Sequence, residues 1–351
     1  MLYRSANPHG GDIYTEEVKL DFSANINPLG TPPSVLEVMK AALSGAAHYP
    51  DPYCRKAIRA ISEHESVPEN NILLGNGAAE LIYSCCSALN PRKALIPVPA
   101  FSEYETALRL NDCEIIHYPL LPSDNFRPGS GLLVKIMQEK PDVVFLGNPN
   151  NPAGRTLDPE FSKKLITLCV ISGTFIFIDE CFSDLSDNCH EMKEFFDDSQ
   201  NLFILKSLTK SHALAGVRVG YCLCPNQNLL AKMSETVQPW NVSAIAQSAV
   251  PAAMKETEFL AESKKLIRKE RIRLTADLIA SGCIVIPSDT NFILFQAPPG
   301  LDLYLKTMGI AIRNCRNFAG LDDGWYRIAV RQRSDNEILL SYIRKFMEEA
   351  A

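Results

Sequence analysis

The sequence has no block of basic residues and no long apolar run. Lys and Arg number 35 against 41 Asp and Glu, which leaves a formal net charge of −6. A mildly acidic chain without a basic block lacks the attraction that binds nucleic acids and anionic membrane surfaces. No apolar run approaches the roughly 18 residues needed to cross a bilayer. These absences argue against nucleic-acid and membrane partners.

The cysteines lack the spacing of a metal site. There are eleven, with no CxxC pair and no Cys/His cluster of zinc-finger type. We therefore expect no metal centre. Their odd number, and their place in apolar stretches, favour free thiols in a reducing cytoplasm. The first residues, MLYRSANPHGGDIY, carry no apolar h-region, so we expect no secretory signal and a cytoplasmic protein.

Repeats and low-complexity tracts are also missing, which disfavours solenoids and propellers. What is present is ordinary globular composition, with 46% hydrophobic and 22% charged residues over 351 positions. At about 150 residues per domain this length predicts roughly two domains.

From about residue 70 to 225, short apolar runs alternate with longer amphipathic ones. The helical stretches include Ala79–Leu89 and Pro159–Ser172. The predicted strands are Ala94–Val98, Glu114–His117, Val143–Leu146, Phe175–Ile178, Phe203–Leu205 and Val219–Leu223. Runs that are apolar on both faces and separated by helices predict an α/β fold, with a mostly parallel sheet flanked by helices.

After about residue 225 the pattern changes. We expect one long charged helix from Ala244 to Ser281, then three short strands and a closing helix from Asn336 to Glu349. The three strands are Cys283–Ile286, Phe292–Phe295 and Tyr326–Val330. This pattern predicts a smaller α+β domain. The expected division is an N-terminal arm with part of the small domain in 1–47, the large domain in 48–235 and the C-terminal small domain in 236–351.

Five polar motifs follow predicted strands, where ligands of open α/β sheets gather. They are GNGAAE (75–80), NPNNPAG (148–154), IDE (178–180), SLTK (207–210) and AGVRVGY (215–221). Each alone also has a structural interpretation. The first can be a plain tight turn before a helix, the second a pair of Asn-Pro turns. Lys210 can be a solvated loop lysine, and Arg218 one side of an ion pair.

Together the motifs supply an imine-forming lysine, an acid, a phosphate-sized cradle and a fixed arginine, as a pyridoxal phosphate site requires. Asn151 precedes Asp179 by 28 residues, Asp179 precedes Lys210 by 31, and Lys210 precedes Arg218 by 8. In these motifs the sequence resembles the aspartate-aminotransferase superfamily of pyridoxal-phosphate enzymes, over essentially the whole chain. The resemblance implies the type I fold of those enzymes.

The resemblance also implies roles for individual residues. Lys210 and Asp179 are the implied catalytic pair. Lys210 holds the cofactor covalently and moves protons at the substrate carbon, and Asp179 pairs with the pyridine nitrogen. The implied cofactor contacts are Gly77, Ala78, Ala79, Phe101, Asn151, Asp179, Ser207, Lys210, Arg218 and Tyr49. Tyr49 matches the tyrosine that reaches the neighbouring subunit's phosphate, which implies a homodimer with shared sites. Arg327 matches the arginine that grips a substrate carboxylate, although by position it can equally be an ordinary strand residue.

Within this superfamily the sequence resembles the threonine-phosphate decarboxylase branch first and the histidinol-phosphate aminotransferase branch second. His9-Gly10-Gly11 and the segment LDFSANINPLG (20–30) resemble the former. Phe182 stands where aminotransferases typically carry a tyrosine. This resemblance implies that His9, Gly10, Asn25 and Arg313 bind the substrate together with Asn151 and Arg327.

Three functions remain as hypotheses. The first is decarboxylation of O-phospho-L-threonine to (R)-1-aminopropan-2-yl phosphate and CO2, a step of cobalamin side-chain synthesis. The second is transamination of histidinol phosphate with 2-oxoglutarate. The third, a ligand sensor with an added DNA-binding domain, is disfavoured because about 20 residues before Asp21 leave no room for one, and because Lys210 and Asp179 are both present.

Overall fold

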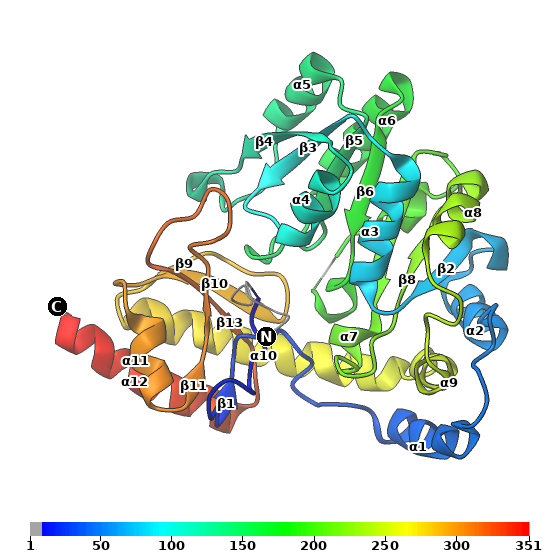
Figure 1. Ribbon diagram of the computed structural model, residues 1–351. Coiled ribbons are helices and arrows are strands. Elements are labelled where there is room, and N and C mark those ends of the chain that lie inside the picture. The colour runs from blue at the N-terminus through cyan, green and yellow to red at the C-terminus, as the bar shows by residue number, and fades with distance from the viewer. Residues whose placement is uncertain (1–8, 188, 351) are drawn as a thin grey trace.

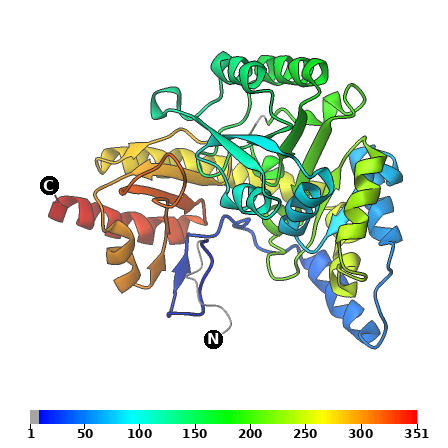
Figure 2. The ribbon, with the colours of Figure 1, turned by 45° about the horizontal axis from the view of Figure 1, so that its top comes forward.

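The computed structural model describes residues 9–187 and 189–350, and it has a large and a small part with the N-terminal segment (residues 9–32) between them (Figure 1). The long helix α10 (Thr257–Ala280), drawn in yellow, runs from the large part to the small part in both views (Figures 1 and 2).

The large part is built on a seven-stranded sheet with the order β2-β8-β7-β6-β5-β3-β4. The strands are β2 (Ile72–Gly75), β3 (Lys93–Val98), β4 (Glu114–Pro119), β5 (Val143–Gly147), β6 (Phe175–Asp179), β7 (Leu202–Ser207) and β8 (Gly220–Leu223). Only β8 runs antiparallel to its neighbours β2 and β7. The predicted mostly parallel α/β sheet is therefore confirmed.

Helices cover both faces of this sheet because its strand residues are apolar on both sides. Leu95, Val144 and Ile176 pack on one face with the helices α1 (Pro33–Ala42), α2 (Arg55–Glu65), α5 (Ser130–Glu139), α6 (Pro159–Ser172) and α9 (Ala244–Ala253). The alternate residues, Phe145 and Phe177 among them, pack on the other face with α3 (Ala78–Leu89), α4 (Ser102–Arg109) and α8 (Gln227–Thr236). A central strand buried on both sides lets only its last residues reach a ligand.

The small part has a four-stranded antiparallel sheet with the order β12-β13-β10-β9. Its strands are β9 (Ile284–Val285), β10 (Phe292–Gln296), β12 (Arg313–Asn314) and β13 (Trp325–Ala329). They pack with α10, α11 (Leu301–Thr307) and α12 (Arg333–Ala350). The three strands and the closing helix expected here are all present, with shifted ends.

The N-terminal segment joins the small part through a strand pair. β1 (Leu20–Asp21) runs parallel to β11 (Ile310–Ala311). The domain boundaries at 47/48 and 235/236 stay a prediction. The remaining helical elements are short: α7 (Leu208–Ser211), η1 (Leu43–Gly45), η2 (Glu69–Asn71), η3 (Pro122–Asp124), η4 (Ser183–Leu185) and η5 (Met192–Phe195).

The single helix expected from Ala244 to Ser281 is wrong. The chain leaves α9 after Ala253 and begins α10 at Thr257. Pro251 lacks the N–H that would extend the hydrogen-bond ladder, which weakens the last turn of α9. The two helices also pack on different partners, α9 on α1 and α2, and α10 on α12. Tertiary packing thus divides a sequence that reads as one helix.

Within the described residues, no helix is both long and apolar enough to cross a membrane. The same residues contain no group of three or more His, Cys, Asp or Glu side chains arranged to hold a metal ion. All eleven cysteines are free thiols, and ten of them are buried.

Candidate active site

A cavity of about 380 Å³ opens where β6 and β7 end, between the large and the small part. Most of the residues predicted for the site line it: His9, Gly10, Asn25, Ala78, Ala79, Phe101, Asn151, Asp179, Ser207, Lys210, Arg218, Arg313 and Arg327. They come from the N-terminal segment, from the edge of the large sheet where its parallel strands end, and from the small sheet. Folding therefore collects residues separated by up to about 320 positions around one space.

Lys210 lies in the short helix α7, which begins directly after β7. Burial and the neighbouring Arg327 lower the pKa of its amine to about 8. Its Nζ lies 5.9 Å from the centre of the Phe182 ring. No hydrogen bond to Nζ is made by the described residues. An amine with a lowered pKa is available as a nucleophile near neutral pH.

Asp179 is the last residue of β6, and its carboxylate is held by two donors. The Tyr104 hydroxyl donates to Oδ2 at 2.6 Å, and the Cys181 amide donates to Oδ1 at 2.9 Å. Burial and this carboxylate raise the pKa of Tyr104 well above its ordinary value, so the hydroxyl keeps its proton. Asp179 is thereby fixed as an acceptor that faces the cavity.

A phosphate-sized cradle lies at the start of α3. Gly77 precedes the helix with φ +79°, and no side chain caps the first amides of Ala78 and Ala79. A Cβ on Gly77 would come within 2.4 Å of Arg218 Nη2, so only glycine lets this guanidinium approach. Ser207, the N-cap of α7, also faces the cavity. Free amides, a hydroxyl and a guanidinium together suit a phosphate group.

Two arginines from the small sheet form the opposite wall. Arg313 on β12 and Arg327 on β13 are paired directly across the strands. Arg327 donates to the Asn151 side chain and, at 2.9 Å, to the Ser23 carbonyl. Its Nε is buried with no partner among the described residues.

Burial lowers the pKa of both guanidinium groups, that of Arg327 to about 10. Neither arginine makes an ion pair with a carboxylate in the described part of the chain; Arg313 instead donates to Asn314 and Asn317. Two neighbouring cations that lack a counter-anion mark this wall as an anion site.

Asn25 and His9 complete the wall from the N-terminal segment. Asn25 is 2% exposed, and its Oδ1 has no partner in the described residues. His9 Nε2 lies 2.7 Å from Glu103 Oε1, and its ring lies 5.6 Å from that of Phe101. Gly10 packs closely on Ser23. A Cβ at position 10 would lie 2.5 Å from the Ser23 carbonyl oxygen, so the contact requires glycine.

Two predicted cofactor contacts do not line the cavity within the single chain. Gly77 does not line the cavity, but its lack of a side chain leaves the space that the Arg218 guanidinium occupies. Tyr49 is 78% exposed and stacks on Trp240, with ring centres 4.4 Å apart. Its role toward a second subunit is not tested by one chain and stays a prediction.

The sequence did not indicate the cavity residues Glu103 and Cys181, nor the buried Tyr104 that donates to Asp179. Glu103 and Tyr104 follow the predicted Phe101 in the segment PAFSEYE, and they lie in helix α4. A carboxylate and a phenol directly after a predicted cofactor aromatic were the available signal.

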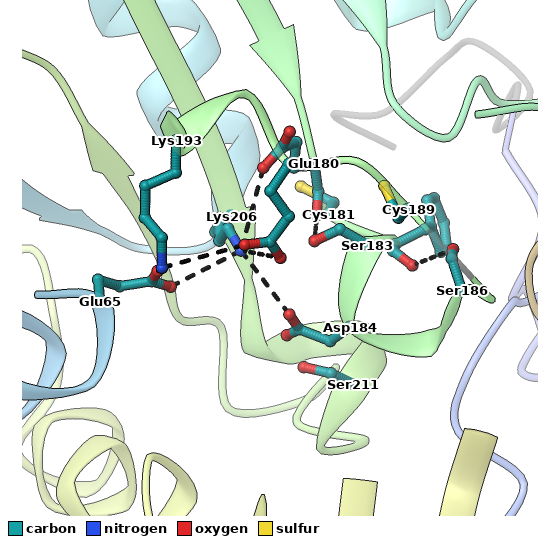
Figure 3. A network of polar contacts seen from close by, with 12 residues as sticks. Glu65, Glu180, Cys181, Ser183, Asp184, Ser186, Cys189, Lys193, Lys206 and Ser211 are labelled. Carbon is teal, nitrogen blue, oxygen red and sulfur yellow. Dashed lines mark hydrogen bonds and ion pairs between the residues drawn. The ribbon is translucent and has the colours of Figure 1, made fainter. Parts of the chain in front are cut away.

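A buried ionic network lies next to the site (Figure 3). Two of its members, Lys206 and Glu180, are the chain neighbours of residues that face the site. Lys206 precedes Ser207, and Glu180 follows Asp179. Lys206 Nζ lies 2.8 Å from Glu191, 3.7 Å from Glu65, 3.9 Å from Asp184 and 4.0 Å from Glu180. Lys193 and Tyr221 also bind Glu65, at 2.7 and 2.6 Å. The network ties the ends of β6 and β7 to α2.

Comparison with known proteins gives a family and several relatives. The model of the family described as aminotransferase class I and II matches residues 17–343. A threonine-phosphate decarboxylase of Salmonella typhimurium is 32% identical, covering 99% of this chain and 98% of its own. A histidinol-phosphate aminotransferase of Archaeoglobus fulgidus is 29% identical, covering 98% and 99%. The solved structure of the histidinol-phosphate aminotransferase from Clostridium acetobutylicum superposes with a TM-score of 0.87, at 31% identity, over 94% of this chain and 99% of that one.

Proposed function

The chain belongs to the aminotransferase class I and II family, and from that membership we propose that it is a pyridoxal-phosphate-dependent enzyme. Its reaction, in this proposal, is the decarboxylation of O-phospho-L-threonine to (R)-1-aminopropan-2-yl phosphate and CO2. This would place it in cobalamin side-chain synthesis, in the cytoplasm. The relative from Salmonella typhimurium, named a threonine-phosphate decarboxylase, supports this choice by its full-length match.

The cavity residues fit the cofactor. Lys210 supplies an amine of lowered pKa, and Asp179 supplies a carboxylate held by Tyr104. Arg218, Ser207 and the first amides of α3 form a phosphate cradle. Phe101 and Asn151 complete the cofactor wall. Pyridoxal phosphate, when bound, supplies an electron sink for the pair of electrons left at the substrate Cα.

The observation that carries the proposed substrate is the pair of arginines Arg313 and Arg327, which have no carboxylate partner in the part of the chain that the structure describes. O-Phosphothreonine carries a carboxylate and a phosphate on one small molecule, so it can satisfy both guanidinium groups at once. In this assignment Arg327 binds the carboxylate, and Arg313 binds the phosphate with His9 and Asn25.

The residues have separate tasks in the reaction. Arg327 and Asn151, which bind each other, would hold the substrate carboxylate in one fixed orientation. The bond from Cα to the carboxylate carbon breaks, CO2 leaves, and the electron pair stays at Cα. The Lys210 ammonium then delivers a proton to Cα, for which its lowered pKa is suited.

A second candidate is the histidinol-phosphate aminotransferase reaction, which the relatives from Archaeoglobus fulgidus and Clostridium acetobutylicum carry in their names. Histidinol phosphate has no carboxylate. In this reading Arg327 would bind a carboxylate of glutamate or 2-oxoglutarate.

Turnover with each substrate set distinguishes the two. The holoenzyme is offered phosphothreonine alone and, separately, histidinol phosphate with 2-oxoglutarate, and kcat/KM is measured for each. Multiple turnovers of phosphothreonine without an oxo acid, lost in Lys210→Ala, support the decarboxylase. Efficient glutamate formation from the second set, with none from the first, supports the aminotransferase and contradicts the proposal.

We also propose that two chains form a homodimer with shared sites, because Tyr49 lies on the surface beside Trp240 rather than in its own cavity. Mixing inactive Tyr49→Phe and Lys210→Ala variants should restore partial activity, since one hybrid site carries neither change. Recovery at no mixing ratio, with subunit exchange demonstrated by mass, would contradict sharing.

A further inference from the structure

Among the described residues that line the cavity, Glu103 is the one carboxylate to which the proposed cofactor and substrate contacts give no task. It lies in α4, two residues after Phe101, and its side chain is 17% exposed. A carboxylate close to an anion site repels the anion and so weakens its binding. Its presence here therefore calls for a separate role. Its surroundings identify that role.

Both oxygens of Glu103 are engaged by groups from different segments. Oε1 lies 2.7 Å from His9 Nε2, and Oε2 accepts from the Tyr83 hydroxyl at 2.5 Å. Tyr83 belongs to α3, the helix that begins at the phosphate cradle. The His9 contact holds the pKa of the Glu103 carboxyl below its ordinary value, so Glu103 is ionised at neutral pH. Glu103 therefore joins α3, α4 and the N-terminal segment.

The other end of this N-terminal segment is fixed to the small part. The Gly11 amide donates to Ser23 Oγ at 2.7 Å, and Gly10 packs on the Ser23 backbone. Ser23 follows the β1–β11 pair, and its carbonyl accepts from Arg327. Residues 9–11 thus cross from the small part to Glu103 in the large part, along the cavity wall that holds Arg313.

We propose that Glu103 is a positioning residue that holds His9 at the cavity wall, so that residues 9–11 close over the phosphate end of the substrate. The part of this inference that concerns the substrate rests on the proposed function. Glu103 itself does not touch the substrate, because both of its oxygens are already bound to His9 and Tyr83. A charge-assisted contact to His9 is stronger than a neutral one, which is why a carboxylate suits this position.

The test compares holoenzymes that carry Glu103→Gln, Glu103→Ala and the control Glu105→Gln. Glu105 lies in the same helix but pairs with Arg109 and His117 away from this wall. Hydrogen exchange of the Gly11 amide reports docking of the segment without any substrate. We expect exchange at least tenfold faster in Glu103→Ala, less in Glu103→Gln, and unchanged in Glu105→Gln.

Kinetics add the second readout. We expect Glu103→Ala to raise KM for phosphothreonine at least tenfold and to change kcat less than threefold, with cofactor absorbance unchanged. Wild-type exchange rates at Gly11 in both Glu103 variants would overturn the inference whatever the substrate is. Faster exchange with an unchanged KM would overturn the positioning role. A wild-type enzyme that does not turn over phosphothreonine contradicts the proposed function, and the exchange data then decide alone whether Glu103 holds the segment.

Discussion

At the scale of single residues, the cavity divides its charges by wall. Lys210 and Asp179 line the cavity from the strand ends of the large part, and Arg313 and Arg327 line it from the small sheet. Burial lowers the pKa of Lys210 and of both arginines, so each of these side chains gains from an anionic or carbonyl ligand. The choice of substrate therefore depends on which anionic group binds to each of the two arginines.

The first prediction concerns Arg313. In the native protein, Arg313 Cζ lies 5.0 Å from the centre of the Phe318 ring. Arg313→Met keeps an apolar side chain over this ring and removes the charge. Loss of charge-assisted phosphate contacts should reduce kcat/KM for phosphothreonine by on the order of 2–4 kcal/mol, about 30- to 1000-fold. Unphosphorylated threonine should be a poor substrate for both forms.

Arg316→Met serves as the control, because Arg316 is exposed, lies three residues further on and does not line the cavity. It should leave kcat/KM unchanged. Equal losses for phosphothreonine and threonine in Arg313→Met would remove Arg313 from the phosphate site.

At the scale of elements, the site depends on strand ends and the turns that follow them. These could be predicted, because an apolar run that stops at a polar residue is a local signal, as at Asp179 and Ser207. For Tyr104 and Glu103 the only sequence signal was their place after Phe101, because a helix that packs across the sheet sets their contacts. The two-residue strand β12, which carries Arg313, is too short for a periodic pattern. The helix expected from Ala244 to Ser281 failed for a related reason, since packing on separate partners ends α9 at Ala253.

The second prediction concerns the turn between β2 and α3. Gly77→Ala places a Cβ 2.4 Å from Arg218 Nη2 and strains a residue at φ +79°. The displaced guanidinium should weaken cofactor binding at least tenfold, measured as an equilibrium dissociation constant by absorbance titration.

Gly173→Ala is a matched control, because Gly173 has φ +74° but no atom within 4 Å of the added Cβ. It should lower stability by roughly 1 kcal/mol from backbone strain and leave cofactor affinity unchanged. Equal effects of the two substitutions on affinity would contradict the role of Gly77.

At the scale of the whole molecule, two parts and an N-terminal segment meet at one cavity. The buried network around Lys206 lies next to this cavity (Figure 3). Burial raises the pKa of Glu180 in this network to about 7, against an ordinary value of 4.5. The folded protein therefore binds this proton more tightly than the unfolded chain does. The stability that it contributes is fully present below pH 4.5 and is lost as the pH rises to about 7.

The third prediction follows from that sign. Glu180→Gln keeps the acceptor for the Met192 amide and Asn148 but cannot ionise. Compared with the wild type, it should lose less stability between pH 4.5 and 7, by roughly 3 kcal/mol. Denaturant unfolding at several pH values measures this. Glu194→Gln, which removes a half-exposed partner of His190, should keep the wild-type pH slope. The same slope in Glu180→Gln would show that Glu180 does not hold the proton.

We propose above all that the residues of this cavity promote cleavage of the bond between Cα and the carboxylate of O-phosphothreonine. The most direct measurement follows substrate labelled at the carboxylate carbon, incubated with holoenzyme and no oxo acid. We expect one labelled CO2 for each (R)-1-aminopropan-2-yl phosphate formed, over many turnovers per site, and none with Lys210→Ala. Label that stays in an oxo-acid product, with no more than one turnover per site, would contradict it.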